Sequence, residues 1–412
     1  MINFRMLKAS DFALWIAAGI LTAIGFFAVF SSTYAMQIKF GADSLLFIKR
    51  QGFACMLGLI GLSFFTYLDY KHLKKINYFL YAFMLFLLLI VLFGGTGAQG
   101  AQRWFQIGPF TFQPSEIAKI IMVLCLAAFF DEHKRLQYTW EKGLLLILVA
   151  FPFLLIFKQP DLGTALVFIG ILFGFLAASW ASPKFLTVLF TPIISILFRP
   201  LLPLWIIYLL ALAVSLFLTR AKVWDWIWII GTNTVVGAAM PFIWGILKPY
   251  QRQRITAFLD PASDPYGAGY HSLQSKIAIG GGGLFGKGFM HGTQTQLQFI
   301  PEQHSDFIFS AIGEEWGFIG AALTLILFVI VLWRALVIAA DARDNFGFLV
   351  ASGIAAMTAF HILANVGMVL GILPVVGIPL PFISFGGTSL IMNLIAIGIL
   401  QSICMRRQKL IF

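Results

Sequence analysis

Long runs of apolar residues, separated by short segments that carry most of the charges, dominate this chain of 412 residues. A membrane-spanning helix needs about 20 consecutive apolar residues. Continuous apolar runs exclude a membrane barrel, whose strands alternate apolar and polar residues. The expected fold is all-α: a polytopic transmembrane helical bundle that forms one membrane domain over residues 1–412. Ten spans are predicted, at residues 11–31, 52–69, 77–94, 115–131, 143–158, 162–180, 226–247, 305–333, 346–370 and 385–404.

Two further apolar runs, at residues 184–198 and 201–219, are separated by Arg199 and Pro200. The first run is short for a span, so the pair is either a full hairpin or a re-entrant element. Because the runs come as a pair, the sidedness of all later segments is the same in both cases. Residues 184–219 are therefore expected to be an inserted hydrophobic pair.

The distribution of Lys and Arg predicts the orientation, because these residues collect in cytoplasmic loops. With the N-terminus in the cytoplasm, sixteen of them fall on the inner side and eleven on the outer side. Both termini are then cytoplasmic, and the long segment 248–304 lies outside. The first apolar run, residues 12–30, lacks a convincing cleavage site and is expected to be a signal anchor.

Composition supports a membrane protein and argues against several other classes. The chain is 60% hydrophobic and 11% charged, whereas soluble domains carry about 25% charged residues. The net charge of +11 is dispersed over short loops, which favours membrane orientation and anionic lipid over nucleic acid. Cys55, Cys125 and Cys404 lie in apolar runs without metal-ligand spacing, so they are expected to be buried apolar residues.

The external segment 248–304 is unusually long for a loop and contains aliphatic and aromatic residues throughout, so it is expected to be ordered. Its part from His271 to Ile279 can form a short helix. Asp260 and Asp264 each precede a proline, which holds the backbone around them rigid and extended. Such pairs are common in turns. A carboxylate held at a membrane surface among basic residues also suits a general base. The residues alone leave both interpretations open.

Charges inside or at the ends of spans form a second set of candidates. Glu116 and Lys119 stand three residues apart on one helix face, either as a structural ion pair or as the lining of a wet cavity. Arg50, Arg103 and Asp161 lie at outer span ends, where they either anchor the helices or line a cationic cavity for a phosphate group. The stretch 379–389 must interrupt the last span, so its backbone is buried or lines a cavity.

Several motifs, in order along nearly the whole chain, resemble those of the SEDS family (shape, elongation, division and sporulation). The motifs are Arg50–Gln51, Gly100–Trp104, Gln113–Lys119, Gln159–Ala165, Asp264–Tyr270, Pro301–Phe309 and Pro381–Gly387. Within that family, residues 291–299 are similar to the elongation branch rather than the division branch. The family has about ten spans, so residues 184–219 depart from its pattern.

The resemblance implies a peptidoglycan glycosyltransferase of the bacterial inner membrane that joins lipid-linked disaccharide-pentapeptide (lipid II) to the growing glycan. It also implies a class B penicillin-binding protein and other elongation-complex proteins as partners. The family's catalytic aspartate maps to Asp264 as general base, and Asp260 is then structural. A divalent cation, Mg²⁺ or Mn²⁺, is a candidate cofactor whose ligands the sequence does not identify. The substrate-binding residues implied are Arg50, Arg103, Glu116, Lys119, Asp161, Gln274 and Ser275.

Two other functions fit parts of the pattern. A transporter that flips the lipid-linked precursor would use the charged residues inside the spans and the interrupted final helix. It would not need a positioned carboxylate in a long external loop. A scaffold that only holds the penicillin-binding protein would not depend on Asp264. Movement of labelled lipid without polymer favours the transporter, and normal cell shape in an Asp264→Asn strain favours the scaffold.

Overall fold

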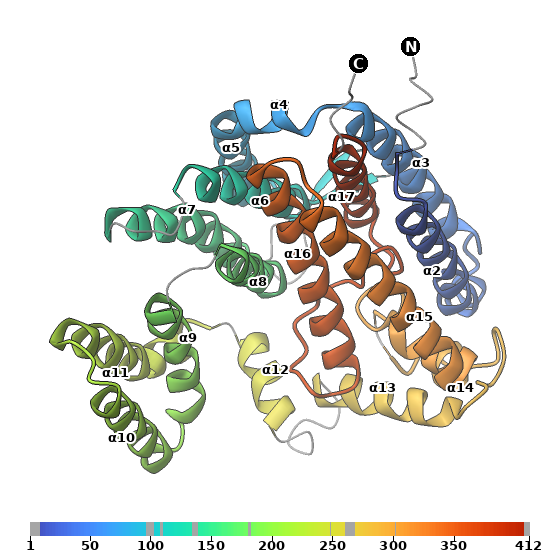
Figure 1. The fold of residues 1–412 in the computed structure, drawn as a ribbon. Helices are drawn as coiled ribbons and strands as arrows, with labels where there is room; N and C mark the ends of the chain where they lie inside the picture. Colours follow the sequence, from blue (N-terminus) through green and yellow to red (C-terminus); the bar gives the residue numbers. More distant parts are fainter. Residues whose placement is uncertain are drawn as a thin grey trace, which may run out of the picture.

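A computed structural model describes residues 9–95, 103–107, 110–133, 139–179, 183–247, 249–259, 268–300 and 302–407 (Figure 1). The helices are α2 (Phe12–Lys39), α3 (Leu46–Tyr67), α4 (Tyr70–Lys75), α5 (Asn77–Gly94), α6 (Pro114–Glu132), α7 (Thr139–Lys158), α8 (Leu162–Ala178), α9 (Pro183–Phe198), α10 (Leu202–Leu218), α11 (Val223–Ile246), α12 (Pro249–Leu259), α13 (Ala268–Gly282), α14 (Thr293–Gln296), α15 (Ile308–Ala340), α16 (Asn345–Val369) and α17 (Gly387–Met405).

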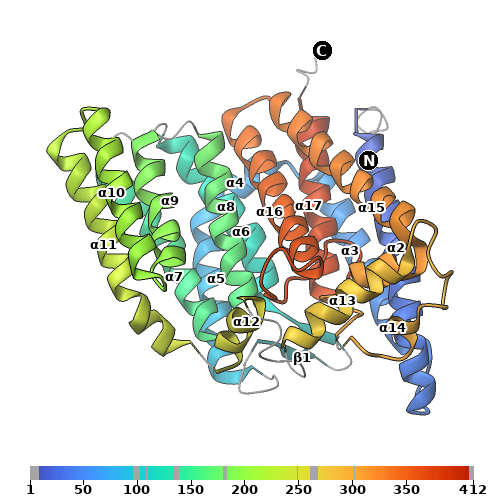
Figure 2. The same ribbon diagram turned by 90° about the horizontal axis from the view of Figure 1, so that it is seen from below.

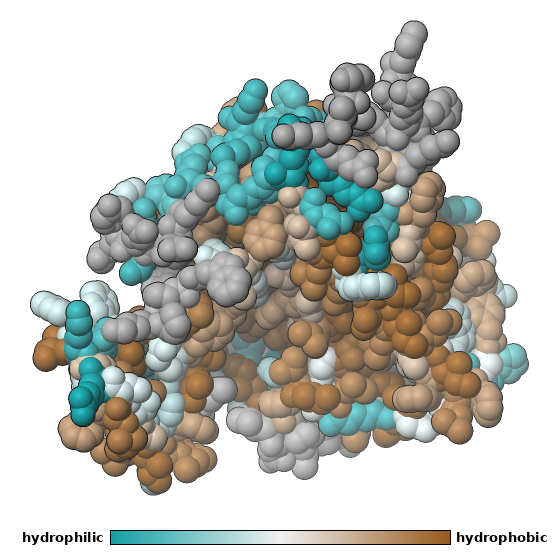
Figure 3. All heavy atoms as spheres, in the orientation of Figure 1, coloured by the Kyte–Doolittle hydropathy of each residue, from teal (hydrophilic) through white to brown (hydrophobic). Residues whose placement is uncertain are grey.

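The predicted helical membrane bundle is confirmed. Every predicted apolar run corresponds to a helix, and eight helices within the described residues are long and apolar enough to cross a membrane. Figure 3 shows hydrophobic residues over the face formed by α15 and α2, with hydrophilic residues gathered over α4. One element was not expected. Strands β1 (Phe105–Ile107) and β2 (Phe110–Phe112) form a small antiparallel hairpin, with Phe105 opposite Phe112.

The two terminal spans end on one face of the bundle. The side chain of Gln401 in α17 accepts a hydrogen bond from the Asp11 amide (2.9 Å) and donates one to the Asp11 carbonyl oxygen (2.8 Å). Figure 2 shows α12, α13 and α14 at the opposite end of the molecule. The beginning of the first span and the end of the last span therefore share one face, and α12, α13 and α14 lie at the other.

Close contact between α3 and α17 fixes the centre of the bundle. A Cβ atom on Gly58 would lie 3.3 Å from the Ile391 Cα, and one on Gly398 would lie 2.5 Å from the Leu62 carbonyl oxygen. Small residues let helix backbones approach this closely in membranes. The pairs 58–391 and 62–398 advance together, so α3 and α17 run in the same direction.

The predicted inserted pair forms a hairpin, α9 and α10, that packs against α11 at one edge of the molecule (Figures 1 and 2). A stack of Phe173 on Phe190, with ring centroids 4.0 Å apart, joins α9 to α8. Inside the three-helix unit, the Trp205 indole N–H donates to the Ser195 hydroxyl (2.6 Å), and that hydroxyl donates to the Asn233 carbonyl oxygen (2.8 Å). Polar side chains thus hold this unit together where apolar burial offers no driving force.

Replacing Asn233 by leucine is expected to loosen the α9–α11 unit. The Asn233 amide donates to the Thr191 hydroxyl (2.7 Å) and accepts from Tyr208 (3.1 Å), so two interhelical bonds are lost. Such bonds contribute about 0.6 kcal/mol each on average and at most about 1.7. Thermal unfolding in detergent should show a destabilisation of about 1–3 kcal/mol. Thr232→Val is the control, because the Thr232 hydroxyl bonds only to its own helix. Equal melting of both variants would contradict the prediction.

The predicted helix in the long segment and the predicted interruption before the last helix are both present. Helix α13 includes the predicted helix at 271–279. Residues 371–386 are non-helical although Ile383 is fully buried. This stretch packs on α2, where a Cβ on Gly25 would lie 2.7 Å from the Ile383 Cα. Helix α15 is kinked at Gly317, whose φ of +66° favours glycine.

Candidate active site

The starts of α6, α8 and α17 meet at the end of the bundle where α12 and α13 lie. The Gln113 amide before α6 donates to the Thr388 hydroxyl of α17 (3.1 Å), and that hydroxyl donates to the Thr111 carbonyl oxygen (3.1 Å). The Gln113 side chain donates to the Asp161 carboxylate before α8 (3.0 Å). A helix start concentrates partial positive charge, so three such starts at one place favour anionic groups there.

Asp161 is buried and holds this meeting point rigid. Its carboxylate caps α8 by accepting from the Thr164 amide (3.2 Å) and hydroxyl (2.9 Å), and it also accepts from Ser115 (3.4 Å). Arg103 is half-buried and donates to the carbonyl oxygens of Gln159 (3.1 Å) and Pro160. The structure therefore brings Arg103 and Asp161 together, and both side chains form hydrogen bonds with residues at the start of α8.

Glu116 and Lys119 form a buried ion pair in the first turns of α6. The Lys119 ammonium lies 2.8 Å from the Glu116 carboxylate and 3.1 Å from Nε2 of His361 in α16, and both charged side chains are at most 5% exposed. The other ring nitrogen of His361 lies 3.2 Å from the Pro379 carbonyl oxygen. A carbonyl oxygen can only accept, so Nδ1 carries the ring proton and donates it to Pro379. Nε2 is then unprotonated and accepts from Lys119. This series of contacts links α6 to the interrupted segment before α17.

The remaining candidates in the described residues are spread over other elements. Arg50 is exposed near the start of α3. Gln274 is half-buried on α13, and Ser275 is fully buried beside it, where its hydroxyl donates to the Val369 carbonyl oxygen (2.8 Å). Ser275 thus joins α13 to the end of α16 in this structure.

Asp260 and Asp264 lie outside the described residues, in the connection between α12 and α13. Arg252 in α12 donates to the carbonyl oxygens of Leu247 (3.0 Å) and Gly245 (2.7 Å), so it stabilises the end of α11. Arg254 lies near Asp306, which belongs to the segment before α15. A Cβ atom placed on Gly377 would lie 3.5 Å from the Arg254 guanidinium and 3.1 Å from the Asp306 carboxylate.

Asp306 is a carboxylate at this site that the sequence analysis did not single out. The pKa of its carboxyl is raised to about 6, chiefly by burial. The positive charges of Arg254 and Arg103 oppose this rise, and the negative charges of Glu302 and Asp161 add to it. The motif that contains Asp306 contributed to the family resemblance. However, only the fold shows that Asp306 shares a site with Arg254, 52 positions earlier in the chain.

The raised pKa of Asp306 predicts how stability depends on pH. The folded protein binds this proton more tightly than the unfolded chain, whose carboxyl keeps the ordinary value of 3.8. Stability from the neutral carboxyl is therefore complete below about pH 4 and is lost as the pH rises to about 6. In Asp306→Asn this loss is absent, so its melting temperature relative to wild type should rise between pH 4.5 and 7. A pH-independent difference would contradict this assignment.

The described residues contain no group of three or more His, Cys, Asp or Glu side chains placed to hold a metal ion. The ligands of the divalent cation predicted as a candidate cofactor are therefore not identified among these residues. The chemistry that they offer is cationic and hydrogen-bonding.

Comparison with known proteins assigns the family. Residues 11–197 and 177–409 match the FtsW, RodA and SpoVE family of cell cycle proteins. The chain belongs to this family. It is 40% identical over 312 residues to the peptidoglycan glycosyltransferase MrdB of Escherichia coli K12, which covers 75% of this chain and 72% of MrdB. It is 34% identical over 399 residues to stage V sporulation protein E of Bacillus subtilis, covering 95% of this chain and 96% of that protein.

Solved structures of FtsW/RodA/SpoVE-like proteins share the fold. A chain from a peptidoglycan synthase complex that coordinates polymerization and crosslinking matches with a TM-score of 0.71 and 29% identity, covering 97% of this chain and 99% of that one. Thermus thermophilus RodA matches with a TM-score of 0.63 and 26% identity, covering 97% and 98%. The predicted family is confirmed, and the chain is a glycosyltransferase. Because division and sporulation relatives also match, the elongation branch stays a prediction.

The match to the FtsW/RodA/SpoVE family also bears on the inserted pair. The two matched ranges overlap at residues 177–197, which contain most of α9. The domain boundaries of 184–219 and 248–304 remain predictions.

Two acidic residues of α15 were missed by the sequence analysis. Glu314 is fully buried and accepts hydrogen bonds from the amides of Gln294 and Thr295 (both 2.9 Å) and from Lys287 (2.8 Å). Glu315 is buried and accepts from Ser31 of α2 and from the Gln296 side chain (3.4 Å). Both carboxylates therefore brace the segment between α13 and α15. The signal in the sequence is two adjacent acids inside an apolar run, which is costly without partners.

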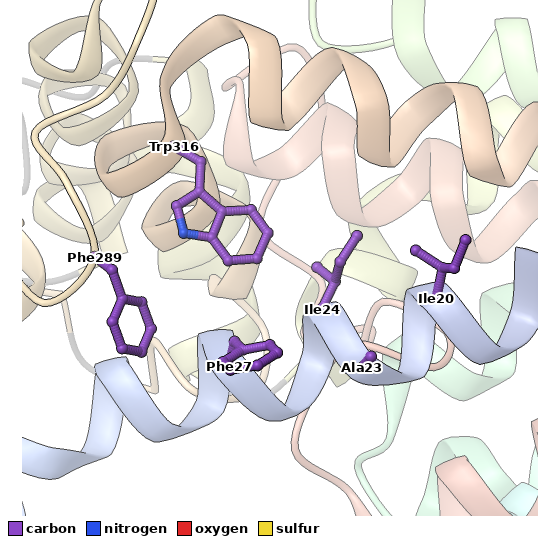
Figure 4. Close-up of a pocket in the computed structure, with 6 residues that line it drawn as sticks. All are labelled: Ile20, Ala23, Ile24, Phe27, Phe289 and Trp316. Atoms are coloured by element: carbon purple, nitrogen blue, oxygen red, sulfur yellow. The ribbon is translucent and has the colours of Figure 1, made fainter.

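An apolar groove lies between α2 and α15. Figure 4 shows Trp316 and Phe289 facing the α2 side chains across it. Its volume is about 520 Å³, and its lining offers no titratable side chain, so it does not supply the acid–base chemistry of a transferase. The lining residues are Ile20, Ala23, Ile24, Phe27, Phe289 and Trp316.

Proposed function

We propose that this chain is a RodA-type peptidoglycan glycosyltransferase that polymerises lipid II into glycan strands during cell elongation. The relatives named peptidoglycan glycosyltransferase support the reaction, and the similarity of residues 291–299 to the elongation branch supports the role. The observation that carries the proposal is the meeting of three helix starts with Arg103, Arg254 and Asp306 beside the two helices that flank Asp264. This arrangement can bind an anionic lipid headgroup next to a carboxylate base.

In the proposed reaction, lipid II enters sideways from the outer leaflet. Asp264 takes the proton from the 4-hydroxyl of the acceptor sugar. The hydroxyl oxygen attacks the anomeric carbon of the donor, and undecaprenyl diphosphate leaves. An α-linked donor gives a β-linked product, so the configuration inverts in one displacement with one base and no covalent intermediate.

The cationic residues have different parts in this proposal. Arg50 is exposed and Arg103 half-buried, so a phosphate at the outer surface can approach them directly. Lys119 is held by Glu116 and His361 beneath the surface, so it contributes to the positive potential rather than to a direct contact. Gln274 on α13 can donate to the sugar part of the substrate, and Ser275 positions that helix.

We further propose a class B penicillin-binding protein as partner, together with other proteins of an elongation complex. The structural match to a chain of a complex that coordinates polymerization and crosslinking supports a partner of that class. In the proposed orientation both termini are cytoplasmic and the Asp264 segment is on the outer side of the bacterial inner membrane.

The test is polymerisation of purified lipid II by the chain reconstituted in liposomes with its penicillin-binding partner, whose own polymerase capacity has been excluded. Glycan strands that depend on this chain support the proposed function. Movement of labelled lipid across the bilayer without strands would replace it by a transporter. If both activities are absent and the partner is still bound, the protein would instead be a scaffold for that partner.

A further inference from the structure

The start of α17 is an open helix N-terminus within the candidate active site. Gly386 precedes the helix and provides no capping side chain, and the amides of Gly387, Thr388 and Ser389 have no acceptor among the described residues. Residues 385–387 are partly exposed, and a Cβ on Gly386 would approach only Ser389, at 3.5 Å. Unsatisfied amides at the positive end of a helix favour an anion such as phosphate.

A second observation at this place is independent of the helix end. Gln51 of α3 is 1% exposed, and neither its Oε1 nor its Nε2 has a hydrogen-bond partner among the described residues. Buried amide side chains are nearly always paired, so these two polar atoms are available to a water molecule or a ligand.

The packing of α3 on α17 places Gln51 level with the open helix start. Gln51 and Gly58 belong to the same buried stripe of α3, two turns apart. Gly58 contacts α17 at Ile391, and the two helices run in the same direction. One turn before Gln51, the ring of Phe47 lies 4.9 Å from that of Phe385. Gln51 therefore lies between these two contacts, opposite the first turn of α17.

The surroundings hold this helix start in a fixed place. The Phe385 amide donates to the His304 carbonyl oxygen (2.9 Å), and the Ser384 hydroxyl donates to that of Ser305 (2.6 Å). Thr388 is joined to Gln113 on the other side. The open start is thus preformed, and Arg50 next to Gln51 adds a positive charge on the exposed side of α3.

We propose that the first turn of α17 and the Gln51 side chain form a binding subsite for a phosphate of the lipid-linked diphosphate. The amides of residues 387–389 donate to the phosphate oxygens, and Gln51 Nε2 donates a further bond. This inference rests on the proposed function, since it assigns the diphosphate of that substrate to one place. The anionic headgroup of a phospholipid carries the same phosphate chemistry and must be distinguished by experiment.

Binding of undecaprenyl diphosphate to the full chain with its partner, in neutral detergent, tests the subsite. Gly386→Ala is the sharpest variant. The residue has an extended backbone (φ 172°) that alanine adopts, and its Cβ has room in the structure but would occupy the space of the anion. Gln51→Glu places a negative charge against the phosphate. We expect each variant to weaken binding at least about tenfold. Gly52→Ala is the matched control, since its Cβ meets nothing within 4 Å, and it should bind as wild type does.

Unphosphorylated undecaprenol and vesicles of phosphatidylglycerol complete the experiment. Undecaprenol binding that is equal in all variants supports a subsite for phosphate. Loss of phosphatidylglycerol binding to the same extent as undecaprenyl diphosphate binding would overturn the substrate assignment in favour of a phospholipid headgroup. Undiminished diphosphate binding by both variants, in a wild-type chain that polymerises lipid II, would overturn the subsite and leave the proposed function intact. A wild-type chain without polymerisation would remove the proposed function itself.

Discussion

Replacing Asp264 by asparagine is expected to abolish glycan strand synthesis without unfolding the protein. Asparagine has the same shape but cannot accept the proton of the acceptor hydroxyl. A positioned general base contributes about 10²–10⁴-fold to a rate, so strand formation should fall to the detection limit of a gel assay. The measurement is polymerisation of lipid II by the reconstituted chain with its partner, with thermal unfolding recorded on the same samples.

Asp260→Asn is the matched control for Asp264→Asn. It makes the same chemical change four residues earlier, at the other Asp–Pro pair, and is expected to keep most of the activity. Full activity of the Asp264→Asn protein would remove Asp264 as the base. The geometry then favours Asp306 as the next candidate, because Asp161 already caps α8 and Glu116 is paired with Lys119. The raised pKa of Asp306 would give such a base an activity that increases as pH passes about 6.

The sequence predicted the spans well because their signal is local. Helix α5 was predicted at 77–94 and occupies Asn77–Gly94, since charged or polar residues precede the run and glycines end it. The β1–β2 hairpin was not predicted, because three-residue strands carry no periodic signal. The functional site could be predicted only through motifs. Their order along the chain indicated the family, and the family match is confirmed.

The contacts that define the site were outside the reach of the sequence because they join distant residues. Lys119 pairs with Glu116, as the spacing of three suggested, but its contact with His361 spans 242 positions. Gln51 was quoted only as part of a motif, and its lack of a partner depends on how α3 packs against α17. Likewise, the long segment 248–304 was expected to be ordered. The hydrogen bonds that support it join Glu314 to residues 19–27 positions earlier in the chain.

The buried ion pair of α6 gives the second large expected effect. Lys119→Met leaves the Glu116 carboxylate at membrane depth without its cation and removes the donor to His361. Breaking a buried ion pair by removing one partner costs about 3–5 kcal/mol, because a charge then stays buried and unpaired. We expect a comparable loss in the free energy of unfolding in detergent, together with reduced strand synthesis through disorder of the α6 start.

A double-mutant cycle separates this cause from a simple loss of packing. Glu116→Gln combined with Lys119→Met removes both charges, so the double variant should be more stable than Lys119→Met alone. Lys49→Met is the control for the substitution itself, since Lys49 pairs with Asp43 on an exposed surface and should change the melting temperature little. If the two single losses simply added in the double variant, the ion pair would not be the source of the stability.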